Sequence, residues 1–342
     1  MADRVLLTGV SGVIGSHVAL ALLNAGYIVR GSLRSLGKAD AVRDTLKRAG
    51  GDVGRLEFVA LDLESDAGWR ESAADCRFVQ HIASPFWLKM PRDKMEMIAP
   101  AVAGTRRALE AALDAGAERI VMTSSAAAIL YGHPREMHKT HVFSSADWSG
   151  TTGDDVNAYV ESKTRAELEA WSVVEAAGRR EALVAINPTI VLGPLLSEDI
   201  GTSAVVVQRT VNGSTPIVPN ITFNIIDVRD VAALHVNAMT SPDAGGKRFL
   251  ACAASVTLFD LGQMLKDAFP QFAGKVPRFT IPDWLARMLV FTDSELRDNA
   301  DAIGRRQRLD TGAAADLLGR PYITPRVAAS ATAKSLIDYG LV

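Results

Sequence analysis

The segment TGVSGVIG, residues 8–15, constrains the fold of this chain more than any other stretch of the sequence. It follows the apolar run VLL and precedes the amphipathic stretch SHVALALLNAG, so it joins an expected strand to an expected helix. A dinucleotide-binding turn needs one glycine for the tight bend, one for approach of the pyrophosphate, and one for close helix packing. Gly9, Gly12 and Gly15 suit these roles, and the following helix would direct its positive end at the phosphates.

Apolar runs alternate with helical patterns throughout the first half of the chain. The expected strands are RVLLT, IVRGSL, LEFVAL, FVQHIA, RIVMTS and ALVAIN, and the expected helices span 13–25, 38–49, 66–74, 93–115 and 156–177. Strands that alternate with helices form right-handed βαβ units around a parallel sheet. The pattern predicts an α/β protein with a Rossmann-type, doubly wound parallel sheet.

The regular alternation weakens after Pro188, where glycine and proline breakers separate shorter elements. A helix over 228–240 and the run KRFLAC at 247–252 return to the earlier pattern, and two short helices, one ending at Gly319, close the chain. We therefore expect a dinucleotide-binding domain over 1–190 that also receives roughly 225–252. A smaller, partly interleaved C-terminal α/β substrate lobe would comprise 191–224 and 253–342.

Composition excludes several classes of partner. The 342 residues include 37 Lys and Arg against 39 Asp and Glu, a balance that argues against binding to nucleic acid or to an anionic membrane. The longest apolar runs are too short for a transmembrane helix, and the N-terminus lacks a secretory cleavage site. The two cysteines, Cys76 and Cys252, lack metal-ligand spacing and fit a reducing compartment. These features predict a cytoplasmic protein.

The end of the second expected strand bears on the choice between NAD and NADP. An acidic residue there holds the ribose 2′-hydroxyl of NAD, whereas arginine holds the 2′-phosphate of NADP. This strand ends in GSLRS, with Arg34 and then Lys38, and the nearest carboxylate, Asp40, belongs to the next expected helix. A guanidinium matches phosphate oxygens, so NADPH is favoured. Binding of NAD, with the two basic residues as an ordinary solvated pair, stays open.

A second motif carries the candidate chemistry. Tyr159 and Lys163 are four residues apart in an expected helix and share one face. A nearby ammonium favours the phenolate form of a tyrosine and so eases proton transfer. Ser125, in TSSAA after the expected strand RIVM, would face the crevice at the carboxyl end of the sheet and bind a substrate carbonyl oxygen.

These motifs together resemble the extended short-chain dehydrogenase/reductases, in particular the dihydroflavonol reductase, cinnamoyl-CoA reductase and aldehyde or ketone reductase group. The resemblance rests on TGVSGVIGSHV, LRSLGKAD, ALDLESD, HIASPF, TSSAAA, ADWS, YVESKTRAE, NPTIVLGP, DVRDVAALHV and LLGRPYITP, which cover nearly the whole chain. It implies a catalytic triad of Ser125, Tyr159 and Lys163. The cofactor-binding residues that it implies, with those of the glycine turn, are Gly9, Ser11, Gly12, Val13, Ile14, Gly15, Arg34, Lys38, Asp62, Leu63, His81, Ile82, Ala83, Ser84, Thr123, Ser124, Tyr159, Lys163, Pro188, Thr189, Ile190 and Val191.

One position departs from the dihydroflavonol reductases. They carry Asn or Asp five residues after the catalytic serine, where this chain has Leu130, so a flavonoid substrate is in doubt. Phe86, Trp87, Leu130 and Tyr131 suggest an apolar substrate pocket that tolerates aromatic groups. Val205, Val206 and Phe223 are further pocket candidates, with a place in the core of the smaller lobe equally expected.

The sequence also holds signals that we interpret as structural. His138 and His141 lack a third ligand at metal-binding spacing, so no metal site is expected. Lys163 and Glu167 have the spacing of an i,i+4 ion pair. Ser125 lacks the G-x-S-x-G elbow of a nucleophile.

We therefore expect an NADPH-dependent carbonyl reductase for hydrophobic or aromatic aldehydes and ketones, acting as a monomer or homodimer. The alternatives are a nucleotide-sugar epimerase or dehydratase of the same superfamily and, outside enzymology, a non-catalytic NADP-sensing protein.

Overall fold

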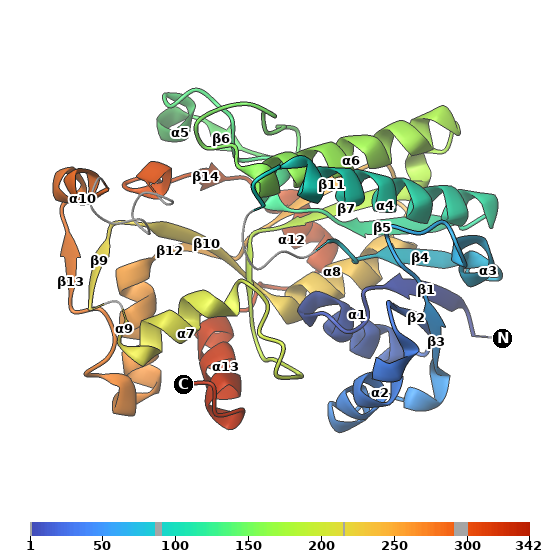
Figure 1. Ribbon diagram of the computed structural model, residues 1–342, viewed down its shortest axis with the longest axis horizontal. Coiled ribbons are helices and arrows are strands. Elements are labelled where there is room, and N and C mark those ends of the chain that lie inside the picture. The colour runs from blue at the N-terminus through green and yellow to red at the C-terminus, as the bar shows by residue number, and fades with distance from the viewer. Residues whose placement is uncertain (1, 86–90, 215, 291–299) are drawn as a thin grey trace.

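A seven-stranded sheet organises the larger part of the protein (Figure 1), in a computed structural model that describes residues 2–85, 91–214, 216–290 and 300–342. Its strand order is β11-β7-β5-β4-β1-β2-β3, and every neighbouring pair is parallel. The strands are β1 (Arg4–Thr8), β2 (Ile28–Leu33), β3 (Leu56–Ala60), β4 (Phe78–His81), β5 (Arg119–Thr123), β7 (Leu183–Pro188) and β11 (Arg248–Ala251). The direction of winding reverses between β1 and β4, which opens a crevice outside their carboxyl ends.

Helices cover both faces of this sheet because successive strand residues face opposite sides. In β1, Val5 and Leu7 belong to one buried cluster and Leu6 to another. The first cluster packs under α1 (Val13–Asn24), α2 (Ala39–Arg48), α8 (Val228–Thr240) and α12 (Gly312–Leu318), and the second under α3 (Trp69–Ala73), α4 (Met95–Asp114) and α6 (Ala158–Ala176). Figure 1 shows α4 and α6 side by side above the sheet. The predicted doubly wound parallel sheet is confirmed.

Smaller sheets build the rest of the protein. The strand β10 (Thr222–Asp227) pairs in parallel with β8 (Ile190–Leu192) and antiparallel with β12 (Ala254–Thr257). Two parallel pairs join β9 (Ile217–Pro219) to β13 (Phe279–Ile281) and β6 (Val142–Phe143) to β14 (Arg308–Leu309). The further α-helices are α5 (Met137–Thr140), α7 (Ala204–Asn212), α9 (Leu258–Ala268), α10 (Asp283–Leu289) and α13 (Pro325–Asp338). Short 3-10 helices are η1 (Leu36–Lys38), η2 (Val53–Arg55), η3 (Ala126–Ala128), η4 (Arg180–Ala182), η5 (Pro270–Phe272) and η6 (Ala300–Ala302).

The element bounds follow the sequence pattern closely, with one clear difference. The helix expected over 228–240 is α8 with the same bounds. The helix expected over 66–74 shortens to 69–73 because Gly68 adopts a left-handed backbone, with φ of 81°, directly before it. The chain returns to the large sheet through α8 and β11, whereas β10 stays in the small sheet. The domain boundaries given above remain a prediction.

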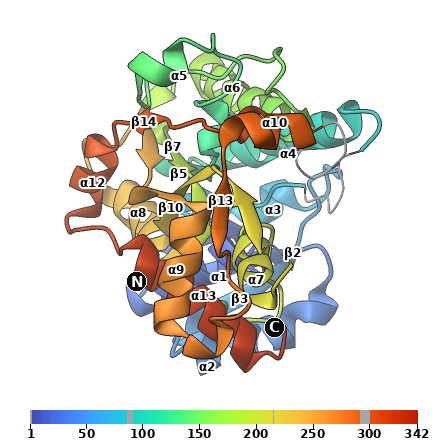
Figure 2. The same cartoon turned by 90° about the vertical axis from the view of Figure 1, so that its left-hand side faces the viewer.

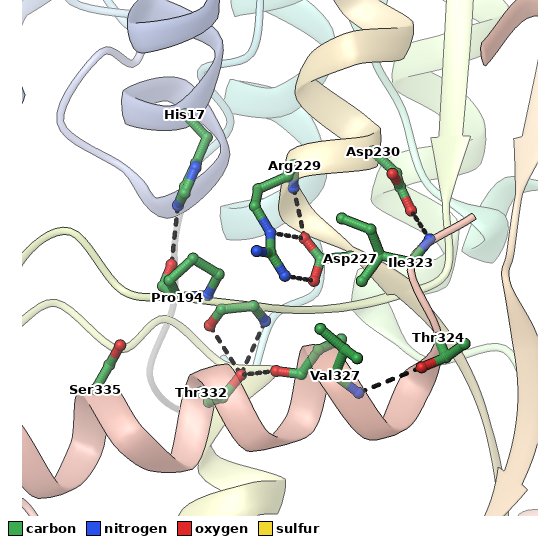
Figure 3. Close-up of polar contacts among 12 residues, drawn as sticks. His17, Pro194, Asp227, Arg229, Asp230, Ile323, Thr324, Val327, Thr332 and Ser335 are labelled. Atoms are coloured by element: carbon green, nitrogen blue, oxygen red, sulfur yellow. Dashed lines mark hydrogen bonds and ion pairs between the residues drawn. The ribbon is translucent and has the colours of Figure 1, made fainter. Parts of the chain in front are cut away.

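The C-terminal helix α13 fastens the loop that follows β8 (Figure 3). The Thr332 hydroxyl donates to the Gly193 carbonyl at 2.9 Å and accepts from its N–H at 2.8 Å. On the other side of the loop, His17 of α1 donates to the Pro194 carbonyl at 2.9 Å. Figure 2 shows α13 beside α9 and α7, whose packing holds it in place. The loop after β8 is therefore fixed between α13 and the first helix.

No helix among the described residues has both the length and the hydropathy to cross a membrane.

Candidate active site

The glycine turn leaves space where a dinucleotide phosphate would approach. A Cβ at Gly9, whose φ is 73°, would lie 3.0 Å from the backbone of Ala83, and a Cβ at Gly15 would lie 2.0 Å from the Gly9 carbonyl oxygen. A Cβ at Gly12, in contrast, would approach only the Gly9 oxygen, at 3.6 Å. Packing inside the protein therefore requires glycine at the first and third positions. At the second position, Gly12, the side on which a Cβ would stand is open and available to a ligand.

The start of α1 is suited to an anion. Gly12 precedes the helix without a side-chain cap, and the first turn holds no acidic residue. The uncapped N–H groups of Val13 and its neighbours, with the positive end of the helix dipole, attract phosphate. Ser11 is exposed beside them, and Ile14 packs inward. The turn lies at the crevice between β1 and β4, so these residues fit a dinucleotide pyrophosphate.

The segment after β4 is held against this turn by Thr8. Its hydroxyl accepts from the N–H groups of Ile82 and Ala83, both at 3.0 Å, which leaves its proton for Nδ1 of His81 at 3.1 Å. Burial, with a smaller contribution from the Lys163 ammonium, lowers the pKa of His81 to about 4. His81 is thus a neutral, structural support for the segment expected to line the cofactor.

A second buried histidine lies below the end of β5. His235 donates from Nδ1 to Oε1 of Gln80 at 2.7 Å and accepts the Thr123 hydroxyl at Nε2 at 2.8 Å. Burial lowers the pKa of His235 to about 3. Thr123 therefore points into the interior, and its predicted contact with the cofactor stays a prediction.

We expect His81 and His235, the two histidines with the largest burial-driven shifts, to make the fold sensitive to mild acid. Both pKa values lie below the ordinary 6.5, so the unfolded chain binds protons that the folded protein does not. The stability they contribute is present above pH 6.5 and is lost as the pH falls toward about 4 and 3. Between these pKa values, the free energy of unfolding falls by up to about 1.4 kcal/mol per pH unit for each histidine as the pH is lowered. Denaturant unfolding between pH 7 and pH 5 measures this dependence, and His235→Gln should remove part of it.

The two basic residues expected at the 2′-phosphate lie beyond β2. Arg34 and Lys38 are exposed, and neither side chain forms a hydrogen bond or ion pair with the residues the structure describes. Asp62 and Leu63 follow β3 at the same edge of the sheet; Asp62 is exposed, and Leu63 packs against Gly104 of α4. The unpaired guanidinium of Arg34 is thus available to an anionic ligand.

The structure brings the three catalytic candidates together. The Tyr159 hydroxyl donates to Oγ of Ser125 at 3.4 Å. Nζ of Lys163 donates to Oγ of Ser84 at 3.1 Å and lies 5.9 Å from the centre of the Tyr159 ring. Asn157 caps α6 through the N–H of Val160, which places Tyr159 at the second helical residue, with 41% of its surface exposed. Ser125 Oγ also accepts from the Ala127 N–H at 3.1 Å, so its own proton is free to donate to a substrate.

The remaining predicted residues differ in their surroundings. Pro188 ends β7, Thr189 donates to the Ala251 carbonyl, and Ile190 and Val191 pack partly against the buried clusters on either side. Leu130 is 3% exposed and packs with Phe143 and Leu250. Its place in a substrate pocket stays a prediction.

Other pocket and metal candidates are placed as follows. Tyr131 is partly buried, with the Arg305 guanidinium 6.0 Å from its ring centre. Val206 and Phe223 pack against the core of the small sheet, and Val205 is partly buried. Phe86 and Trp87 lie outside the described residues. His138 packs on Phe143, His141 bonds Asp147, and the described part of the chain holds no group of three metal-ligating side chains.

One feature of the site escaped sequence analysis, and one pairing was wrong. Glu167 forms no ion pair with Lys163; it pairs with Arg248 of β11 at 2.6 Å, and Lys163 turns toward Ser84 instead. Glu167 is fully buried and also accepts the Ser124 hydroxyl at 2.5 Å. Glu167 and Arg248 are 81 residues apart in the chain. The one sequence signal for their pairing is that a basic residue, Arg248, begins the otherwise apolar strand β11.

Comparison with known proteins identifies the family. The sequence profile of the NAD dependent epimerase/dehydratase family matches residues 5–252. The chain belongs to this family. It is 33% identical to cinnamoyl-CoA reductase 1 of Petunia hybrida, over 78% of each chain, and 32% identical to ketoreductase azaE of Aspergillus niger, over 83% of this chain and 87% of the relative. Yeast methylglyoxal/isovaleraldehyde reductase Gre2, solved with NADPH, superposes with a TM-score of 0.80 at 26% identity and covers 99% of this chain and 100% of its own.

These matches confirm the predicted resemblance to the extended short-chain dehydrogenase/reductases and the cinnamoyl-CoA reductase group. The chain is an oxidoreductase of the epimerase/dehydratase family. The predicted use of a nicotinamide dinucleotide is confirmed, because the family is NAD dependent and the similar yeast structure was solved with NADPH.

Proposed function

We propose that the protein is an NADPH-dependent carbonyl reductase for hydrophobic or aromatic aldehydes and ketones. The observation that carries the proposal is the cluster of Ser125, Tyr159 and Lys163 at the sheet edge, where the glycine turn opens. A sensor of NADP occupancy would need the turn but not the three hydroxyl and amine groups. The relatives are named as reductases, of a cinnamoyl-CoA thioester, of ketones and of aldehydes.

Each side chain has a defined part in the proposed reaction. Bound NADPH supplies the hydride that reduces the carbonyl carbon. The Ser125 hydroxyl donates a hydrogen bond to the carbonyl oxygen and holds it within reach of Tyr159. The Tyr159 hydroxyl then gives its proton to that oxygen, which completes the alcohol, and the Lys163 ammonium stabilises the phenolate that is left.

The proposed NADPH preference gives a direct prediction at Arg34. Replacing the unpaired guanidinium in Arg34→Ala should raise the KM for NADPH on the order of 10- to 100-fold and leave that for NADH within about twofold, because only NADPH carries the 2′-phosphate. Steady-state rates with both nucleotides measure the change. Arg70→Ala, at an exposed arginine of α3 that pairs with Asp114 of α4, is the control. Equal losses with both nucleotides would contradict the assignment.

A panel of carbonyl compounds tests the function as a whole. Aromatic aldehydes, aryl and cyclic ketones and a dihydroflavonol are offered with NADPH or NADH, and nucleotide oxidation is followed by absorbance. We expect NADPH to be consumed with the aromatic aldehydes and aryl ketones. The family also contains epimerases and dehydratases, which keep their cofactor between turnovers. If nothing in the panel is reduced and the purified protein carries tightly held nucleotide, the epimerase assignment replaces the reductase.

A further inference from the structure

The buried carboxylate of Glu167 lies next to the chain segment that carries Ser125 of the candidate triad. Glu167 is 0% exposed and accepts hydrogen bonds from four side chains: the Ser124 hydroxyl at 2.5 Å, Nδ2 of Asn187 at 2.7 Å, Nε and Nη2 of Arg248 at 2.6 and 3.3 Å, and Nε1 of Trp171 at 3.3 Å. Two of these side chains belong to residues that are joined or bonded to the backbone of Ser125. Ser124 is its neighbour in the chain, and the same Asn187 nitrogen donates to the Ser125 carbonyl at 3.1 Å.

Arg248 extends this network to the loop on the far side of the serine. Its side chain is 8% exposed. It donates to the carbonyl of Ala128, which ends η3, at 3.2 Å and to those of Ser145 and Asp147 at 2.9 and 2.5 Å. Its guanidinium also lies 3.6 Å from the centre of the Trp148 ring. One arginine of the edge strand β11 thus holds both chain segments that enclose the residues after Ser125.

The network connects the two elements whose spacing sets the proposed proton transfer. Glu167 stands one helical turn after Lys163 and two after Tyr159 in α6. Through Ser124 and Asn187 it fixes the end of β5, which carries Ser125. The 3.4 Å separation between the Tyr159 and Ser125 hydroxyls therefore depends on contacts that converge at Glu167.

We propose that Glu167 and Arg248 are a positioning pair that sets the Ser125 hydroxyl against Tyr159, and that they control kcat without contributing to cofactor affinity. The inference rests on the proposed reductase function. Neither residue touches the glycine turn or the basic residues after β2 in the described structure. The expected cofactor residue that Glu167 contacts, Ser124, directs its hydroxyl at the carboxylate rather than at the crevice. Burying an ion pair is costly, and apolar side chains often replace such pairs without loss of stability. A role in positioning Ser125 explains why this protein has a buried Glu167–Arg248 ion pair rather than apolar side chains.

The test separates positioning from folding stability through three variants. Glu167→Gln keeps the shape of the side chain but leaves Arg248 without its carboxylate. Glu167→Gln with Arg248→Met removes both charges together. Asp230→Asn, at an equally buried acid paired with Arg320 on the opposite face of the sheet, is the matched control. Each is assayed for kcat and KM, for NADPH affinity by fluorescence titration, for Tm, and for amide hydrogen exchange in residues 124–131.

The expected results form a pattern that stability alone would not produce. Glu167→Gln should lower kcat at least 10-fold with NADPH affinity within about twofold of the parent, and exchange should accelerate in residues 124–131 but not in β1 or α1. The double variant should recover Tm toward the parent while kcat stays low, because the anchors to the carbonyls of Ala128, Ser145 and Asp147 are gone. Asp230→Asn should lower Tm and keep kcat.

Two results would overturn the proposal. One is a kcat that follows Tm across all three variants. The other is unchanged exchange in residues 124–131 of Glu167→Gln. Failure of the reductase function itself is recognised separately, because the parent protein would then reduce no carbonyl in the panel, while the exchange measurement can still be made.

Discussion

Tyr159→Phe is expected to lower kcat for carbonyl reduction by about 1,000-fold, a far larger loss than any change in NADPH affinity. In the proposed mechanism the tyrosine hydroxyl beside Ser125 is the proton donor, and positioned acid catalysis contributes roughly 100- to 10,000-fold. Among the described residues, the exposed Tyr159 hydroxyl bonds only Ser125, so its loss leaves no buried partner unsatisfied. Single-turnover oxidation of bound NADPH by an aromatic aldehyde measures the chemical step directly.

The control for this variant is Tyr27→Phe. Tyr27 packs edge-on against Phe78 near the start of β2, away from the crevice, so its hydroxyl has no part in the reaction. We expect its kcat to equal that of the parent. If Tyr159→Phe retained more than about a tenth of the parent rate, another group would have to supply the proton, and the assignment of Tyr159 would be wrong.

The glycine turn gives the second large effect, and its two positions should fail in different ways. Gly12→Ala places a methyl group on the open side of the turn, with only the Gly9 oxygen nearby, at 3.6 Å. Its φ of −78° and ψ of 168° suit alanine. The folded protein should therefore tolerate the change, with a Tm within a few degrees of the parent. The methyl group would occupy the space for the pyrophosphate, so NADPH affinity should fall on the order of 100-fold.

Gly15→Ala should instead damage the fold. Its Cβ would lie 2.0 Å from the Gly9 carbonyl oxygen, so the turn and α1 must move apart, at a cost of about 1–3 kcal/mol or more. Thermal unfolding without nucleotide and NADPH titration of both variants separate the two effects. Tight NADPH binding by a folded Gly12→Ala protein would show that the phosphates lie elsewhere.

Local patterns in the sequence predicted most of the fold. The strands of the large sheet and the helices on its faces follow from runs of apolar residues with periods of two and 3.6, and α8 agrees with its expected bounds. Ser125, Tyr159 and Lys163 could be grouped because two lie on one helical face and the third follows a strand that ends at the same edge. Proximity of that kind follows from the topology of a parallel sheet.

What the sequence did not reveal depends on contacts between distant segments. Whether Glu167 turns toward Lys163 or toward the sheet depends on Arg248, and nothing local to α6 specifies that β11 lies beside β7. The inward direction of Thr123 depends in the same way on His235 of α8. The spacing of Leu130 from Ser125 in the chain predicts a place in the substrate pocket, whereas its packing is set by Phe143 and Leu250, which are distant in sequence.

The order of strands in the large sheet also bears on how the protein is made. A chain leaves the ribosome from its N-terminus, and its segments begin to fold in that order. The glycine turn and the three catalytic candidates all precede residue 164, but β7 keeps an open edge until β11 is synthesised. Glu167 precedes its partner Arg248 by 81 residues, so this acid also lacks its counter-ion until β11 is made. The nascent protein thus contains all three catalytic candidates well before it contains β11, the edge strand that completes the sheet and carries the partner of Glu167.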